Sequence, residues 1–192
     1  MKELPKAQNQ QLENLKEEQY KVGEMWISYW KEYSFWDTWQ FWVCIAFIVL
    51  PLVLLYFTID RKRIFLLGFF GFNIHIWLVY LDAVTVRFNF IEYPYKAIPV
   101  IPIHFGVDTS LVPVLFILLY QWIMKRKKSF YLYSFLLVAA LSFILIPILS
   151  YFHFLHLKNG SNYMIVFFGY LLVLFISKGI TNLFIYLYKK EG

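Results

Sequence analysis

Five long apolar stretches, separated by short polar segments, dominate the pattern of hydrophobic and polar positions along this chain. Each stretch is apolar on every helical face, and each is at least as long as the roughly 17 residues that a helix needs to cross a hydrocarbon core of about 30 Å. Strands of a membrane barrel would instead alternate polar and apolar positions. We therefore predict an all-α fold, a polytopic transmembrane helix bundle with about five spans, at residues 39–57, 64–81, 108–124, 130–149 and 162–188.

The tail before the first span has a different pattern. Apolar and aromatic residues recur three and four positions apart, with one polar member, at Leu12, Leu15, Gln19, Val22, Trp26, Tyr29 and Tyr33. This spacing predicts an amphipathic helix over about residues 6–34, within an outward-facing tail of residues 1–38. Three interpretations of the apolar stripe stay open: it lies in the headgroup plane, it packs on the protein's own outer loops, or it pairs with a partner chain.

Residues 93–106 are apolar but do not form a sixth span. Pro94, Pro99 and Pro102 exclude a continuous helix, and the stretch is too short to cross a bilayer. We expect an extended segment at the outer surface of the bundle.

Composition and charge agree with a membrane location. The chain is 60% hydrophobic and 16% charged, which is unlike a soluble domain. Its net charge of +6 does not point to a nucleic-acid partner, because the basic residues lie between the apolar stretches. Segments 61–63, 125–128 and 189–190 hold nine of them, against Arg87, Lys96 and Lys158 in the two loops between. The positive-inside rule then places the N-terminus outside and the tail 189–192 in the cytoplasm.

Tryptophan residues bracket the outer end of the first span. Such rings anchor at the depth of the lipid headgroups, so we expect interface anchors at Trp26, Trp30, Trp36, Trp39 and Trp42.

Candidate chemistry is confined to polar residues within and beside the spans. The chain has no phosphate-binding glycine loop, paired-cysteine metal motif or hydrolase signature, so we expect no cofactor and favour a protein that is not an enzyme. Buried polar side chains in a membrane are costly and mark candidate ligand sites. These candidates are Asn73, His75, Tyr80, Asp82, His104 and Asp108.

Each candidate has a plainer alternative. His75 and Asp82 are seven residues apart and share one helical face, where they form either an outward ligand pocket or hydrogen bonds between helices. Asp108 precedes an apolar run and is suited to capping that helix. His153 and His156 are weak candidates for a metal site, and otherwise are ordinary interfacial residues. A hydrolytic centre built from His104, Asp108, His153 and His156 is a third possibility.

Three stretches carry a resemblance to a known family. LLYFTIDRKRIFLLGFFGFNIHIWLVYLD, IPVIPIHFGVDTSLVPVLFILLYQW and KKSFYLYSF together resemble an uncharacterised family of small multi-pass membrane proteins from spore-forming bacteria. The resemblance covers about residues 35–188. It implies the bacterial cytoplasmic membrane as the location, and it implies no activity.

Two functional hypotheses follow. The first is a non-enzymatic accessory or structural membrane protein that binds lipid, or binds a protein partner through the N-terminal helix. The alternative is a small transporter, channel subunit or sensor with an outward-facing polar pocket around His75 and Asp82.

Overall fold

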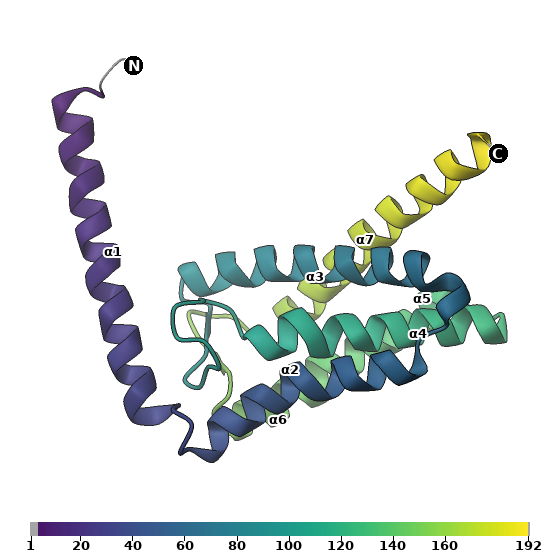
Figure 1. Cartoon of the computed structure of the whole chain (residues 1–192), viewed down its shortest axis with the longest axis horizontal. Coiled ribbons are helices and arrows are strands. Elements are labelled where there is room, and N and C mark those ends of the chain that lie inside the picture. The colour runs from purple at the N-terminus through teal and green to yellow at the C-terminus, as the bar shows by residue number, and fades with distance from the viewer. Residues whose placement is uncertain (1–3, 192) are drawn as a thin grey trace.

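The computed structural model describes residues 4–191 and confirms the all-α membrane bundle (Figure 1). Its helices are α1 (Lys6–Tyr33), α2 (Trp39–Thr58), α3 (Ile64–Arg87), α4 (Val112–Arg126), α5 (Phe130–Ala140), α6 (Ile146–Tyr151) and α7 (Tyr163–Glu191). Shorter elements are the 3₁₀ turn η1 (Arg61–Arg63), the π-helical segments η2 (Val107–Leu111) and η3 (Leu141–Leu145), and the strands β1 (Ile91–Glu92) and β2 (His156–Leu157).

Five helical units are long and apolar enough to cross a bilayer: Trp39–Thr58, Arg61–Arg87, Val107–Arg126, Phe130–Tyr151 and Tyr163–Lys190. Two of them contain a π-helical segment, because η2 leads into α4 and η3 joins α5 to α6. The second span differs most from the sequence prediction, since α3 continues past residue 81 to Arg87. The helix continues there because Asp82 faces the bundle interior, where its carboxyl group has hydrogen-bond partners.

Local chemistry explains several helix ends. The hydroxyl oxygen of Thr38 accepts a hydrogen bond from the Phe41 N–H at the start of α2. The Asp60 carboxylate accepts one from the Lys62 N–H at the start of η1. At the end of α4, Lys127 adopts a left-handed conformation with φ of 50°, which stops the helix before α5.

Helix α3 is the centre of the bundle and packs against α4 and α7. Leu67, Phe70 and Ile74 on α3 are fully buried. Gly71 lets α4 approach closely, because a Cβ atom there would overlap the side chain of Ile117. In contrast, α2 leaves an almost continuous apolar surface uncovered, from Val49 to Leu54, as a lipid-facing helix does.

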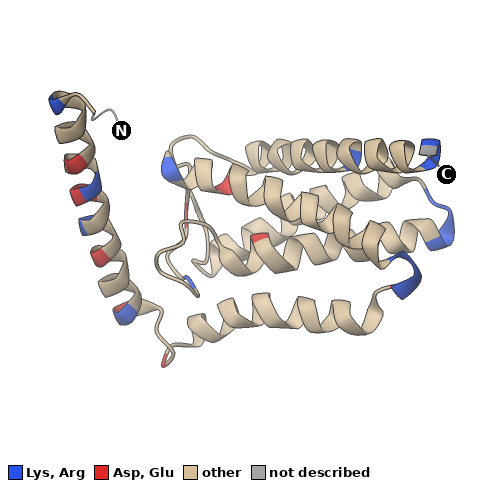
Figure 2. Ribbon diagram, turned by 45° about the horizontal axis from the view of Figure 1, so that its top comes forward, with Lys and Arg blue, Asp and Glu red and all other residues tan. Residues whose placement is uncertain are grey.

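The two ends of the bundle differ in charge (Figure 2). Lys and Arg from the α2–α3 turn, the α4–α5 turn and the end of α7 gather at one end, which we call the basic end. The opposite end carries α1, the segment 93–106, which is non-helical up to His104, and the antiparallel β1–β2 ladder, and we call it the α1 end. Helix α1 runs across this end rather than along the bundle (Figure 1).

Candidate functional site

A cavity of about 330 Å³ opens between α3 and α7 near the α1 end of the bundle. Apolar side chains from three helices form most of its wall, including Leu78, Leu81, Ile146, Ile165 and Val166. Asp82, Thr85, Tyr93, Asp108 and Tyr170 supply polar groups. A cavity with apolar walls and a few convergent polar groups is the usual form of a small-molecule site.

Two carboxyl groups meet in this cavity. Asp82 comes from α3 and Asp108 from η2, and their side chains lie within hydrogen-bonding reach of each other. Both residues are almost fully buried, with 6% and 4% of their surface exposed. Two buried carboxylates repel each other unless a proton or a cation lies between them. The pair is therefore suited to holding positive charge.

Neighbouring hydroxyl groups donate hydrogen bonds to one carboxyl oxygen of the pair and leave two others without a donor. The Asp82 Oδ1 atom accepts hydrogen bonds from the Tyr93 hydroxyl at 2.7 Å and from the Thr85 hydroxyl at 3.3 Å. The Oδ2 atoms of Asp82 and Asp108 are buried without a hydrogen-bond partner. Buried polar atoms are nearly always paired, so these two oxygens need a donor, which a proton shared by the pair or a ligand group can supply.

Tyr93 is held firmly in its neutral form. Burial raises the pKa of the Tyr93 hydroxyl well above its ordinary value, and the negative charges of Asp82 and Asp108 raise it further. The hydroxyl therefore acts as a hydrogen-bond donor to the pair and not as an acid.

His104, rather than Asp108, satisfies the backbone at the start of η2. The Nδ1 atom of His104 accepts the Val107 N–H at 3.3 Å, and the N-cap residue of η2 is Gly106, so Asp108 lies in the first turn. Asp108 therefore does not occupy the N-cap position of η2, because it lies inside the helical segment, where its side chain is within hydrogen-bonding reach of Asp82 and of the His104 backbone. Burial lowers the pKa of His104 to about 4, and the charge of Lys96 adds to this effect, so the ring is neutral.

Lys96 brings a positive charge near the carboxyl pair from the segment 93–106. Burial lowers the pKa of Lys96 to about 8, and the negative charge of Asp82 partly opposes that shift. The Lys96 ammonium group also lies 4.0 Å from the centre of the Trp26 ring. Lys96 thus contacts Trp26 of α1 and lies close enough to Asp82 to interact with its charge.

The structure separates the predicted site residues into two groups. Asp82 and Asp108 line the cavity and His104 lies beside them, whereas the other three candidates lie apart. The Asn73 amide donates to the Phe69 carbonyl one turn earlier. Tyr80 is 59% exposed on the outside of α3. His75 lies beside the Phe72 ring, and its Nδ1 atom is buried without a partner.

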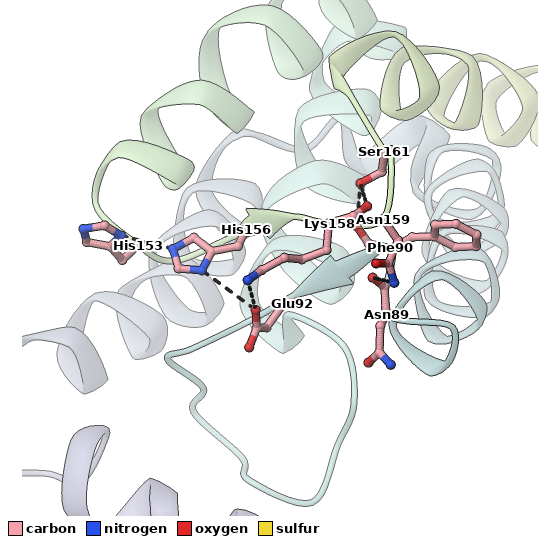
Figure 3. Close-up of polar contacts among 8 residues, drawn as sticks. All are labelled: Asn89, Phe90, Glu92, His153, His156, Lys158, Asn159 and Ser161. Carbon is pink, nitrogen blue, oxygen red and sulfur yellow. Dashed lines mark hydrogen bonds and ion pairs between the residues drawn. The ribbon is translucent and has the colours of Figure 1, made fainter.

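A second polar cluster lies on the surface at the α1 end (Figure 3). The His153 Nδ1 and His156 Nε2 atoms are 3.0 Å apart. Glu92 lies 3.3 Å from the Lys158 ammonium group and 3.9 Å from the His156 Nδ1 atom. Among residues 4–191, no group of three or more His, Cys, Asp or Glu side chains is arranged to hold a metal ion. The contacts of Glu92 with His156 and Lys158 join β1 to β2 and the residue after it.

The predicted tryptophan anchors occupy two environments. Trp36, Trp39 and Trp42 are each more than half exposed around the start of α2. Trp26 and Trp30 instead pack against segment 93–106, where the Trp30 Nε1–H donates to the Lys96 carbonyl at 2.9 Å.

Sequence reasoning missed Thr85, Tyr93, Ser161 and Tyr170, which also line the cavity with polar groups. The chain has 15 tyrosines, and no local pattern distinguishes these two from the others. Thr85 carried one usable signal, since it lies three residues after Asp82 and so shares its helical face.

Fold and site together define a polytopic helical membrane protein with a carboxyl-lined cavity within the bundle. No protein-family model, no curated protein and no solved structure matches this chain.

Proposed function

We propose that this protein binds an amphiphilic molecule with an apolar chain and a cationic or hydrogen-bond-donating head group. The observation that carries the proposal is the buried Asp82–Asp108 pair, which offers two carboxyl oxygens without a hydrogen-bond donor in a largely apolar cavity. The proposal joins the two functional hypotheses, since the ligand is lipid-like and the site is a polar pocket around Asp82. His75 has no part in it.

Charge favours a cationic ligand over an anionic one. Among the described residues that line the cavity, none is Lys, Arg or His. An anionic head group would meet two carboxyl groups without a compensating charge, which is costly in a buried site. With Lys96 supplying one positive charge nearby, a single ligand cation balances the two carboxylates. In the empty protein a proton takes that place.

The apolar walls suit an acyl or alkyl chain. Leu78, Leu81, Ile165 and Val166 lie on α3 and α7, whose outer faces are exposed as lipid-facing helices are. A ligand can therefore enter sideways from the bilayer, with its head group reaching the carboxyl pair. This supports a carrier, a sensor or an accessory protein for a membrane-dissolved molecule.

We further propose that the α1 end faces outward and the basic end faces the cytoplasm of a bacterial cell. The three basic segments lie together at one end, as the positive-inside rule requires of cytoplasmic loops. The candidate site would then open in the outer half of the membrane.

Photolabelling tests the binding proposal. The full chain in phosphatidylcholine nanodiscs is exposed to a long-chain primary amine that carries a diazirine, and labelled residues are mapped by mass spectrometry. We expect labelling of α3 and α7 around Leu81 and Ile165. The Asp82→Asn/Asp108→Asn variant should lose labelling by about tenfold or more, since it removes both charges from a buried site.

Matched controls make the result specific. Glu92→Gln removes a carboxylate at the same end of the bundle but outside the cavity, and it should label like the wild type. A probe with the same chain and a carboxylate head should not label the cavity. Equal labelling by both probes, or full labelling of the double variant, would refute the proposed function.

A further inference from the structure

The apolar stripe of α1 is only partly covered by the rest of the protein. Its C-terminal part packs on segment 93–106, where Trp26 lies over the Lys96 ammonium group and Trp30 donates to the Lys96 carbonyl. Val22, Trp26 and Tyr29 also line a groove against Pro94. These contacts fix which face of α1 is turned toward the bundle.

The same face continues without cover toward the N-terminus. Leu12 and Leu15 precede Trp26 by 14 and 11 residues, which returns them to the same side of a helix of 3.6 residues per turn. Yet Leu12 is 39% exposed and Leu15 is 66% exposed. Their face therefore points toward the side on which the bundle lies, where no part of residues 4–191 covers it.

The position of α1 shows what lies on that side. The helix crosses the α1 end of the bundle and extends past its edge (Figure 1). Trp39 and Trp42, at the start of the first span, lie at the same end and are exposed. Beside a membrane bundle, the space below such an overhang is filled by lipid headgroups and the upper part of their acyl chains. The helical segment of residues 6–22 is by itself about 25 Å long.

Most charges of α1 lie away from the apolar stripe, and they largely cancel. The helix contains four lysines and five glutamates. Lys16 pairs with Glu13 at 2.8 Å, and Lys21 pairs with Glu17 at 2.9 Å. With no excess of basic residues, the helix has no electrostatic preference for anionic lipid.

We propose that the N-terminal part of α1 lies in the headgroup layer of a zwitterionic lipid surface, with Leu12 and Leu15 reaching the acyl chains. The occupant of the uncovered stripe is thus the bilayer that surrounds the bundle, and not a second protein chain. This surface is separate from the cavity of the proposed function and can be tested without it.

Two matched label positions test the proposal in the full-length protein. In a Cys44→Ala background, Leu15→Cys and Glu17→Cys carry an environment-sensitive fluorophore on nearly opposite faces of one helical turn. Leu12→Cys and Glu24→Cys provide a second pair. Each variant is placed in phosphatidylcholine vesicles with and without bromine-labelled acyl chains, which quench a fluorophore that contacts them.

We expect the bromine-labelled lipid to quench the probes at positions 15 and 12 at least threefold more than those at 17 and 24, with no anionic lipid present. Equal quenching within each pair would overturn the proposal. Quenching that requires phosphatidylglycerol would overturn the zwitterionic preference. A second copy would cover the stripe instead if the fluorophores at positions 12 and 15 reported an apolar environment that depends on protein concentration, without quenching by the bromine-labelled lipid.

Discussion

At the scale of single residues, Tyr93 is the strongest hydrogen-bond partner of the carboxyl pair. Its hydroxyl donates to the Asp82 Oδ1 atom at 2.7 Å in a buried environment. Tyr93→Phe leaves that oxygen without its closest donor, so we expect a loss of about 1–3 kcal/mol of stability. Thermal unfolding in a mild detergent measures it. Tyr80→Phe is the control, because Tyr80 is exposed on the outside of α3 and should change stability little. Equal effects would contradict the assigned role.

The neutral ring of His104 predicts a dependence of stability on pH. Its pKa is about 4 in the folded protein and 6.5 in an unfolded chain, so the unfolded chain takes up the proton first. Stability should therefore fall as pH is lowered from about 6.5 to 4, by up to about 3 kcal/mol, and should fall no further through this group below pH 4.

Unfolding midpoints across this pH range test that dependence. His104→Asn keeps a side-chain acceptor for the Val107 N–H but does not titrate, so its midpoint should change less with pH. If the unfolding midpoint of His104→Asn changed with pH as steeply as that of the wild type, groups other than His104 would cause the pH dependence.

Single residues also show how far sequence reasoning reaches. Asp82 and Asp108 were identifiable because burying a carboxyl group within an apolar run is costly, and such groups mark candidate functional sites. His75 shares a face with Asp82, but it lies beside the Phe72 ring and does not line the cavity. Segment 93–106 and α7 contribute Tyr93 and Tyr170 to the cavity, and such long-range packing leaves no periodic signal in the sequence.

At the scale of elements, the crossing of α2 with the start of η2 depends on Gly106. A Cβ atom there would lie 2.8 Å from the Phe47 Cβ atom and 2.9 Å from the Cys44 carbonyl oxygen. Gly106→Ala must push the two elements apart, so we expect a loss of about 1–3 kcal/mol. Gly68→Ala is the control, since nothing lies within 4 Å of an added Cβ there. Thermal unfolding should separate the two variants, and similar midpoints would contradict the close approach.

The span boundaries were largely predictable, because length and hydropathy are local properties of the sequence. Helix α1 (Lys6–Tyr33) agrees closely with the helix that the stripe predicts over residues 6–34. The π-helical segment η2 was not predictable, and it decides the role of Asp108. A π-helical turn changes which side chains face inward, and it is stabilised by tertiary contacts such as the Ser110 hydroxyl donating to the Ile48 carbonyl.

At the scale of the whole molecule, orientation decides which compartment the site faces. Single cysteines at Gln10, Lys127, Asn159 and Lys189 in a Cys44→Ala background can be probed in intact cells with an impermeant thiol reagent. We expect labelling at positions 10 and 159 and none at 127 and 189 until the cells are permeabilised, because the basic segments should be cytoplasmic. The reverse pattern would invert the protein and move the candidate site to the inner half of the membrane.

The central claim is that the Asp82–Asp108 pair holds the head group of a cationic amphiphile. Native mass spectrometry of the protein, released directly from its own membrane, tests this claim on the natural ligand. The wild-type chain should carry a bound basic amphiphile that the Asp82→Asn/Asp108→Asn variant lacks, while Glu92→Gln retains it. The same set of bound lipids on all three proteins, or an anionic lipid on the wild type that depends on the pair, would contradict the account.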